Sequence, residues 1–373
     1  MSVTKSNGPK GRRELLVVDL LSYSESHLAI NGFWIKHLCE RGSFRIVGEA
    51  EHLTALALEA NACIATHPLS RGKGWKLWRE FRFIWAIAGH SCGPIFVMGA
   101  TGLQVLWLAL MERWFPSRAR QWLLVLHSEL EGVERSAGLM KAAAGFAIRR
   151  LGFPRHMNAV VLGQHIKRNL SVHDLDSERI HVIEHPVPTG KFRVMRRIDR
   201  HRPTIAVVGL LRADTKDLSV AAAVAQEPGV MVSMIGRAGP GYAPPPGVRQ
   251  EVIASHFSTG WLLDRLCDID VLLLCPATGM YRYTALGSVG DAITYGRCAA
   301  WLRHEALAAY EHAPFAICAD SVEELVSRIG GFEAPTQEAV EQWVVAWNQA
   351  GALRIHALWD KICAPRSFEI AGE

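Results

Sequence analysis

Short apolar runs alternate with segments of helical periodicity along the first half of the chain. The run Glu14–Leu20 comes first, and a helical segment that ends near Arg41 follows it. Further apolar runs lie at 44–47, 62–65, 94–98, 122–126, 159–162 and 180–183. Helical patterns lie at 52–60, 75–89, 103–114, 133–150 and 164–171. Strands that alternate with helices predict βαβ units around a mainly parallel sheet.

A second set of the same kind starts at Thr204, after a segment that is typical of a linker. That segment combines His185-Pro-Val-Pro188 with the charged stretch Lys191–Arg202. The predicted strands after it are 204–208, 230–235, 270–274, 297–300 and 315–318, and the predicted helices are 216–226, 258–267, 286–295, 321–329 and 336–347. A last helix, Gly351–Cys363, has no strand after it. The chain is therefore predicted to form two Rossmann-like α/β domains in series.

The predicted domain boundaries follow from these two sets of elements. They are a flexible basic N-terminus at 1–13, a first domain at 14–190, a linker at 191–203, a second domain at 204–347, and a C-terminal helix and tail at 348–373. A chain of 373 residues is long enough for two domains with sizeable cores. Apolar residues make up 49% and charged residues 21%, which is a globular rather than a disordered composition.

Cysteines and apolar stretches restrict the compartment in which the chain is expected to work. The 8 cysteines form no Cys-x-x-Cys pair, and several lie in or beside apolar runs, which favours a reducing compartment. The basic segment Met1–Arg13 lacks the apolar stretch of a secretory signal. The longest uncharged run, Cys92–Met111, is interrupted by glycines, so it predicts a strand, a turn and a helix rather than a membrane span.

The formal net charge of +5 is modest, but the basic residues are clustered. The clusters are Lys73, Lys76, Arg79 and Arg82; Arg149, Arg150 and Arg155; and the stretch 191–202. The chain carries no pattern of a nucleic-acid-binding module. An anionic membrane surface or a nucleotide diphosphate is therefore the preferred partner, and nucleic acid is not expected.

The helical pattern at 75–89 mixes aromatic and basic residues. Leu77, Trp78, Phe81, Ile84, Trp85 and Ala88 share one face, which we expect to pack on the sheet. The residues outside that face are Trp75, Lys76, Arg79, Arg82 and Phe83. Aromatic and basic side chains together suit a membrane interface, so these five are predicted membrane contacts. The alternative is an ordinary amphipathic helix that packs on the sheet.

The segment Tyr281–Gly296 carries the clearest indication of chemistry. It follows the apolar run Asp270–Pro276 and combines hydroxyl groups, an aromatic residue and a helix with one inward-facing acid, Asp291. The helix N-terminus would offer backbone N–H groups to a diphosphate, and the acid would bind ribose or sugar hydroxyls. This arrangement resembles the donor site of the retaining glycosyltransferases with the two-domain GT-B fold.

Further segments are similar to the same family, which includes bacterial polysaccharide and lipid-linked glycan hexosyltransferases. Val161–Leu170 with Arg179–Val187 resembles the entry to the family's linker. Gly209, with Arg212 and Lys216 downstream, is similar to the turn that holds the donor phosphates, and Gly236 matches a further strand end of the family. The chain also departs from the family pattern. Tyr283 and Asp291 stand where the family has the two acids of Glu-x7-Glu, and Leu210 stands where the family has an arginine. The loop Ser22–His27 lacks the usual Gly-Gly. The chain is identified as a divergent member.

The resemblance implies a fold of two Rossmann-like domains facing a central cleft, with the C-terminal helix crossing back to the first domain. The second domain would bind the nucleotide sugar and the first domain the acceptor. The predicted donor-binding residues are Gly209, Arg212, Lys216, Gly236, Tyr283, Thr284, Ser288 and Asp291.

Each of these polar residues has an alternative interpretation. Arg212 and Lys216 would neutralise a diphosphate, or they form a solvated turn with Asp214 and Asp217. Asp291, expected to be buried, binds ligand hydroxyls, or it pairs with Arg297 or a backbone cap. The hydroxyls of Thr284 and Ser288 would donate to phosphate oxygens, and the alternative for Ser288 is a helix-surface position.

The predicted catalytic residues are His127, Glu129 and Glu131, which follow the apolar run Trp122–Leu126. A residue at the carboxyl end of a parallel strand lies where α/β proteins bind their ligands. The alternative is that these residues cap the following helix. No metal site is predicted, because no clear helix carries His-x-x-x-His, and no cofactor is expected.

The sequence thus predicts a glycosyltransferase that moves a hexose-type sugar from a nucleotide diphosphate donor to a glycan or lipid-linked glycan. Polysaccharide synthesis and retention of configuration are implied by the resemblance. The expected location is the cytoplasm, with peripheral contact to the inner face of the cytoplasmic membrane. The alternatives are a nucleotide-sugar epimerase or hydrolase of the same fold, and a non-catalytic binding subunit.

Overall fold

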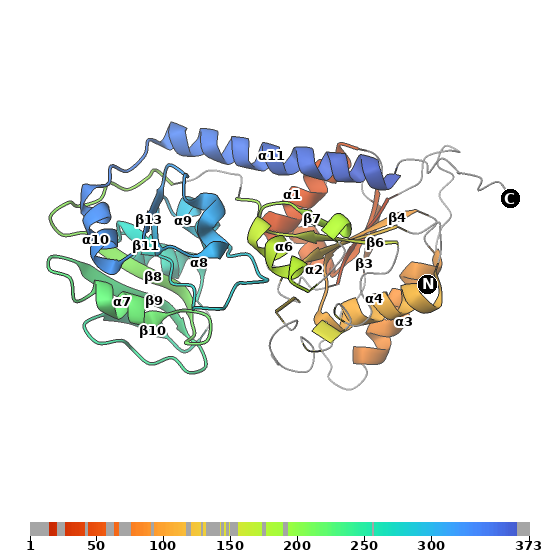
Figure 1. Ribbon diagram of the computed structural model, residues 1–373, viewed down its shortest axis with the longest axis horizontal. Helices are drawn as coiled ribbons and strands as arrows, with labels where there is room; N and C mark the ends of the chain where they lie inside the picture. Colours follow the sequence, from red (N-terminus) through yellow and green to blue (C-terminus); the bar gives the residue numbers. More distant parts are fainter. Residues whose placement is uncertain are drawn as a thin grey trace. The chain divides into compact units, whose positions relative to one another are not determined.

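The computed structural model of the chain divides into two compact units (Figure 1). It describes residues 15–20, 27–41, 44–56, 63–66, 76–90, 93–116, 121–127, 130–131, 142, 145–146, 149, 156–173, 177–188, 193–255 and 257–363. Unit 1 comprises Met1–Val161, His173–His181 and Leu353–Glu373, and unit 2 comprises Leu162–Val172 and Val182–Ala352. The predicted helix at 133–150 lies mostly outside the described residues.

Unit 1 is built on a seven-stranded sheet with the order β3-β2-β1-β4-β5-β6-β7. Its strands are β1 (Leu15–Asp19), β2 (Phe44–Gly48), β3 (Cys63–Thr66), β4 (Pro94–Gly99), β5 (Gln121–Leu126), β6 (Met157–Val161) and β7 (Ile180–Val182). The β1–β2, β1–β4 and β4–β5 pairs are parallel. All six residues of β4 and of β5 are buried, as expected for central strands covered on both faces.

The helices of unit 1 connect these strands in the βαβ manner that the sequence predicts. They are α1 (Leu28–Cys39), α2 (Ala50–Ala55), α3 (Lys76–His90) and α4 (Gly102–Trp114), with the 3-10 turn η3 (Ser177–Arg179). Thr101 and Gln104 form a capping box that starts α4 directly after β4. Over its described residues, 93–111, the run Cys92–Met111 is therefore a strand, a turn and a helix, as predicted. Among the described helices, none is long and apolar enough to cross a membrane.

Unit 2 contains a six-stranded sheet with the order β10-β9-β8-β11-β12-β13. Its strands are β8 (Thr204–Leu211), β9 (Met231–Ala238), β10 (Arg249–Ile253), β11 (Val271–Leu273), β12 (Cys298–Leu302) and β13 (Ala316–Ala319). Its helices are α6 (Gln164–Ser171), α7 (Leu218–Val224), α8 (Thr259–Arg265), α9 (Ser288–Thr294) and α10 (Val322–Gly331), with the 3-10 helix η4 (Glu305–Tyr310). The strand pairs are parallel, so both units have the Rossmann-like topology that the sequence predicts.

The last helix, α11 (Gln337–Cys363), is one continuous helix of 27 residues. The sequence predicted two helices there, 336–347 and Gly351–Cys363. The helix contributes residues up to Ala352 to unit 2 and residues from Leu353 to unit 1. The prediction that the C-terminal helix crosses back to the first domain is therefore confirmed.

The division into units also differs from the predicted boundaries at α6. The sequence placed everything up to residue 190 in the first domain, whereas α6 and the segment from Val182 group with unit 2. Within unit 2, His165 and Asn169 of α6 form hydrogen bonds with the loop before α9. These bonds are described with the site below.

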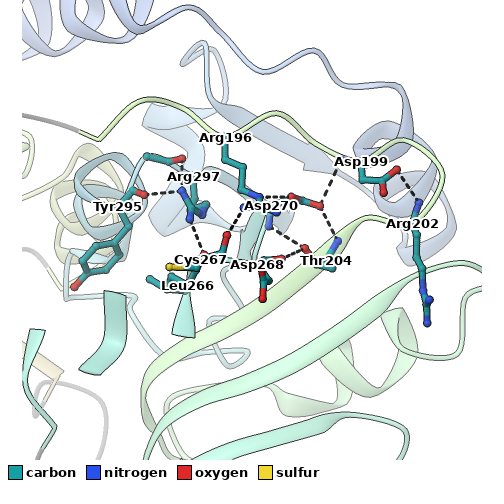
Figure 2. Close-up of polar contacts among 11 residues, drawn as sticks. Arg196, Asp199, Arg202, Thr204, Leu266, Cys267, Asp268, Asp270, Tyr295 and Arg297 are labelled. Carbon is teal, nitrogen blue, oxygen red and sulfur yellow. Dashed lines mark hydrogen bonds and ion pairs between the residues drawn. The ribbon is translucent and has the colours of Figure 1, made fainter. Parts of the chain in front are cut away.

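The linker is held to unit 2 through the buried carboxylate of Asp270, the residue before β11 (Figure 2). Its Oδ1 accepts a hydrogen bond from Arg196 Nε at 2.7 Å, and its Oδ2 accepts from Thr204 N at 3.0 Å and Asp199 N at 3.4 Å. Arg196 also donates to the carbonyl of Cys267. At least this arginine of the basic stretch 191–202 therefore has a structural role.

Candidate functional site

The candidate site in unit 2 lies at the carboxyl edge of its sheet, near the ends of β8 and β11. The chain proceeds from β8 to β9 on one side of β8, and β11 lies on the other side. The strand order therefore changes direction between β8 and β11. In open α/β sheets, ligands bind outside the carboxyl ends of the strands at such a switch point.

Two glycines keep this edge free of side chains. Gly209 of β8 faces Gly236 of β9 in the strand register. Both have positive φ angles, 101° and 151°, which favour glycine. A Cβ atom on Gly236 would lie 1.9 Å from the carbonyl oxygen of Gly209, so no larger residue fits without a shift of the backbone. The structure thus places both predicted glycines at the end of the sheet where a ligand could approach the backbone.

Lys216 is held beside the end of β11 by the loop that follows β8. Its N–H donates to the carbonyl of Arg212 at 2.9 Å, and the next N–H, of Asp217, donates to Cys275 O at 2.9 Å. Lys216 also forms an isolated bridge with Pro276. Burial lowers the pKa of Lys216, whereas Cys275 and Asp291 raise it. Lys216 is half-buried, and its charge interacts with that of the predicted acid.

Arg212 makes a different contact from Lys216. Its Nε donates to Asp214 Oδ1 at 2.9 Å, and a second nitrogen donates to Asp214 Oδ2. This is the solvated turn that the sequence offered as the alternative for Arg212. Asp217, the other acid of the predicted turn, caps α7 instead: its carboxylate accepts a hydrogen bond from Ser219 N.

Asp291 lies in the first turn of α9, and its side chain is exposed. The expectation of a buried carboxylate is therefore wrong, because α9 turns this position toward solvent while its neighbours Gly290 and Ala292 face the core. Surrounding protein atoms nevertheless raise the pKa of Asp291 by desolvation, and Lys216 lowers it. Arg297 is not its partner: that guanidinium donates to the carbonyls of Leu266, Tyr295 and Gly296 (Figure 2).

The loop before α9 is fixed by α6. His165 Nε2 lies 3.1 Å from the carbonyl oxygen of Tyr281 and 3.3 Å from that of Thr284, and it donates because both atoms are acceptors. Asn169 Nδ2 donates to Arg282 O at 3.0 Å. Tyr281 has a φ of 62°, an unfavourable value for a residue with a side chain. His165 and Asn169 are four residues apart, so they lie on one face of α6. This spacing could have indicated that the two side chains act together, but the sequence analysis did not predict a role for either.

The other predicted donor residues differ in accessibility. Tyr283, which stands at the position of the family's first acid, is only 2% exposed, so its ring is packed away from solvent. Thr284 is half-buried, and Ser288 is half-buried at the first position of α9. The structure therefore brings Lys216, Asp291 and the loop at 281–288 to one edge of unit 2, with Tyr283 buried behind that surface.

Unit 1 carries two histidines at the carboxyl edge of its own sheet. His127 follows β5, and its Nε2 lies 3.1 Å from the carbonyl of Met98 in β4. The ring of His27, which precedes α1, lies 5.2 Å from the ring of His127. Desolvation is the largest cause that lowers the pKa of each, and for His27 the value falls to about 4. Both imidazoles are therefore neutral near pH 7. The sequence did not single out His27, although it too follows a predicted strand and a polar loop.

A buried polar cluster lies at the end of β1. Asp19 Oδ2 accepts from Asn31 Nδ2 at 2.6 Å and lies 3.3 Å from His52 Nε2. All three side chains are buried, and Asp19 raises the pKa of His27 and of His127 through its negative charge. Of the two predicted acids after His127, Glu129 lies outside the described residues and Glu131 is half-buried.

Helices α3 and α4 lie side by side (Figure 1). They carry an aromatic surface, defined by Trp78, Phe81, Trp85, Trp114 and Phe115. Trp78 and Trp85, which were expected to pack on the sheet, are 53% and 45% exposed. That part of the prediction is wrong, because Ile84, Ile87 and Ala88 form the buried face of α3. Of the five predicted membrane contacts, Arg82 is exposed and Phe83 is half-buried, while Trp75 and the side chains of Lys76 and Arg79 lie outside what the structure describes.

No protein-family model and no curated protein matches the chain. Solved structures do match over nearly its whole length. The crystal structure of Anabaena Alr3699/HepE in complex with UDP aligns with a TM-score of 0.57 and 13% identity, over 92% of this chain and 100% of that chain. The lipopolysaccharide outer core galactosyltransferase WaaB, in its apo form, aligns with a TM-score of 0.60 and 11% identity, over 92% and 99%. A glycosyltransferase from Rickettsia africae aligns with a TM-score of 0.54 and 9% identity, over 95% and 100%.

These similarities establish the fold class. The chain has the two-domain Rossmann-like GT-B fold, as the sequence predicted. Other crystal structures of HepE hold UDP with glucose, and UDP-glucose. At identities of 13% or below, a shared fold does not establish which ligand a chain binds. The function has to be argued from the residues at the two sheet edges.

Proposed function

We propose that this chain is a glycosyltransferase that uses a nucleotide diphosphate sugar. The observation that carries the proposal is the position of Lys216 and Asp291 at the switch point of unit 2. A half-buried ammonium group gains from a bound polyanion, which replaces part of its lost interaction with water. A diphosphate at this edge would meet Lys216 and the half-buried backbone at Gly209.

The same groups suit the chemistry of sugar transfer. The bond from the anomeric carbon to the diphosphate breaks, so negative charge develops on the leaving oxygen, and a nearby cation stabilises that charge. The exposed carboxylate of Asp291 is an acceptor for ribose or sugar hydroxyls. His165 and Asn169 support this function indirectly, because they hold the loop at 281–284 in position.

Unit 1 is the proposed acceptor-binding domain. His27 and His127 present neutral imidazoles at the end of the sheet, and a neutral imidazole can orient a hydroxyl group or accept its proton. The resemblance noted in the sequence favours a hexose, a glycan or lipid-linked acceptor in polysaccharide synthesis, and retention of configuration. The anomeric configuration of the isolated product, measured by NMR, tests retention.

The transfer reaction separates this proposal from its alternatives. We expect the chain to release nucleotide diphosphate from its donor only when an acceptor glycan is added. The Asp291→Asn variant should lower kcat/KM by about 10- to 100-fold if one charge-assisted hydrogen bond is lost. Asp264→Asn, at an exposed position of α8, is the matched control and should leave the rate unchanged.

Other outcomes of this assay point elsewhere. Release that is independent of the acceptor would indicate a hydrolase, and conversion of the donor to its epimer would indicate an epimerase. Donor binding with no turnover in the presence of a broad acceptor panel would indicate a binding subunit. Equal rates for the Asp291→Asn and Asp264→Asn variants would remove Asp291 from the site.

We further propose that the aromatic surface of α3 and α4 contacts an anionic membrane. Trp78, Trp85, Trp114 and Phe115 are 53%, 45%, 62% and 52% exposed, which is unusual for such large apolar groups. The rings of Trp78, Phe81, Trp85 and Phe115 form a chain of contacts, with centroids 5.6 Å apart for Trp78–Phe81, 5.8 Å for Phe81–Trp85 and 4.8 Å for Trp85–Phe115. Tryptophan is favoured at membrane interfaces, and the exposed Arg82 and Arg113 add positive charge beside the rings.

Vesicle binding tests this surface. Each basic residue near an anionic surface contributes about 1 kcal/mol, so changing Arg82 and Arg113 to Gln should lower partition into phosphatidylserine-containing vesicles by about 10- to 30-fold. Changing Trp78 and Trp114 to Ala should lower it as well, and added salt should weaken the binding of the wild type. Val345→Ala with Leu353→Ala removes exposed apolar groups from α11 and is the matched control. If the intact protein does not co-sediment with anionic vesicles at low salt, the membrane proposal fails.

A further inference from the structure

Helix α1 and the second half of α11 bring two imidazoles and a carboxylate together within unit 1. His37 and Glu40 lie at the end of α1, and His356 lies on α11, 319 residues from His37. His37 Nδ1 is 3.4 Å from Glu40 Oε2, and His356 Nε2 is 3.3 Å from the same oxygen. One ligand atom from each residue lies within 4.8 Å of the other two.

We propose that His37, Glu40 and His356 bind a zinc ion or a similar divalent transition-metal ion. In tetrahedral zinc sites the nitrogen and oxygen ligands lie about 2.0–2.2 Å from the ion, so two ligand atoms are roughly 3.3–3.5 Å apart. The two separations to Glu40 Oε2, 3.4 Å and 3.3 Å, fall in this range. Two imidazoles and one carboxylate are also a known ligand set for zinc, with water as the fourth ligand.

The surroundings of these three residues suit such a site. The side chains of His37 and His356 are 14% and 17% exposed, whereas Glu40 is 47% exposed. The imidazoles are therefore held by the protein, and the carboxylate side is open for entry of the ion and its water. Phe33 packs edge-on against the ring of His37 at 4.7 Å and orients it.

Two further contacts concern how the ligands would be held. Arg41 and Asp360, one turn beyond His37 and His356, form an ion pair at 3.3 Å that keeps α1 and α11 together. His356 Nε2 also lies 3.1 Å from the carbonyl of His37. Binding of the ion would replace this hydrogen bond, because the same nitrogen has to offer its lone pair to the metal.

The ion would fasten the unit 1 part of α11 to α1. Residues of α11 up to Ala352 belong to unit 2, so the helix is covalently continuous with the proposed donor-binding unit. The sequence predicted no metal site, because the cysteines form no Cys-x-x-Cys pair and no clear helix carries His-x-x-x-His. The inference does not depend on the proposed transfer reaction.

Direct metal titration tests the site. The intact chain, free of any histidine tag and treated with a chelator, is titrated with Zn²⁺ by calorimetry and with Co²⁺ by visible absorption. We expect one saturable site and a raised midpoint of thermal unfolding. His37→Gln and His356→Gln should each weaken Zn²⁺ binding at least 10-fold, whereas His312→Gln, at an exposed position in unit 2, should not.

The Glu40→Gln variant keeps the test decisive if a histidine variant fails to fold. Glu40 is the most exposed of the three residues, so its replacement should leave the circular dichroism spectrum unchanged and still weaken Zn²⁺ binding. Absence of saturable Zn²⁺ binding by the wild type would overturn the proposal. Equal affinities of the wild type, Glu40→Gln and His356→Gln would also overturn it.

Discussion

Replacing Lys216 with Met should weaken the binding of a nucleotide diphosphate by about 10- to 100-fold, or roughly 1.5–3 kcal/mol for a charge-assisted hydrogen bond. The methionine keeps the length of the side chain and removes the charge. The pKa of Lys216 is lowered by burial, so the variant also removes a desolvated cation and should fold at least as stably as the wild type. Calorimetry with UDP measures the change.

Arg212 provides an internal comparison for this result. Its guanidinium is already paired with Asp214, so binding a phosphate would first require that ion pair to break or to be shared. We therefore expect Arg212→Gln to weaken UDP binding less than Lys216→Met does. Unchanged UDP affinity in a folded Lys216→Met variant would contradict the assignment of this edge as the phosphate site.

Replacing Asp270 with Ala should lower the free energy of unfolding of unit 2 by about 3 kcal/mol or more. The substitution leaves Arg196 without its carboxylate partner and the N–H groups of Thr204 and Asp199 without their acceptor. Because the chain has two units, denaturation is best followed by hydrogen exchange of the β8 and β11 amides in the intact protein.

Asp268 is the matched control for this prediction. It is the same residue type two positions earlier, but its side chain is exposed. Surface substitutions of this kind change stability by only about 0.5 kcal/mol or less. If the Asp270→Ala and Asp268→Ala variants exchange at the same rate, the Asp270 cluster is not the anchor of the linker.

The fold was largely predictable because buried parallel strands are short continuous apolar runs. Pro94–Gly99 and Gln121–Leu126 show this directly, since all of their residues are buried. The strand β10 was missed because Arg249–Ile253 is a polar edge strand with no apolar run. The break predicted between residue 347 and Gly351 is absent: a glycine costs a helix only about 1 kcal/mol, and buried residues on both sides, including Val344 and Ile355, keep α11 continuous.

The residues of the candidate site could be predicted from the sequence only where they follow the end of a strand. Lys216 and Asp291 could be located because each follows a recognisable strand. The pairing of Arg212 with Asp214 and the role of His165 could not, because they depend on which side chains meet after folding. His165 contacts carbonyl groups 116 and 119 residues away, a distance over which local periodicity carries no information.

Hydrogen exchange with a bound nucleotide sugar tests the central claim most directly. The intact chain is compared with and without UDP-glucose, or with another nucleotide sugar that raises the midpoint of its thermal unfolding. Binding at the switch point of unit 2 predicts slower exchange of backbone amides in 209–217 and 274–291, and loss of this protection in the Lys216→Met variant. Saturable binding that protects neither segment, or protection that is identical in the Lys216→Met variant, would contradict the account.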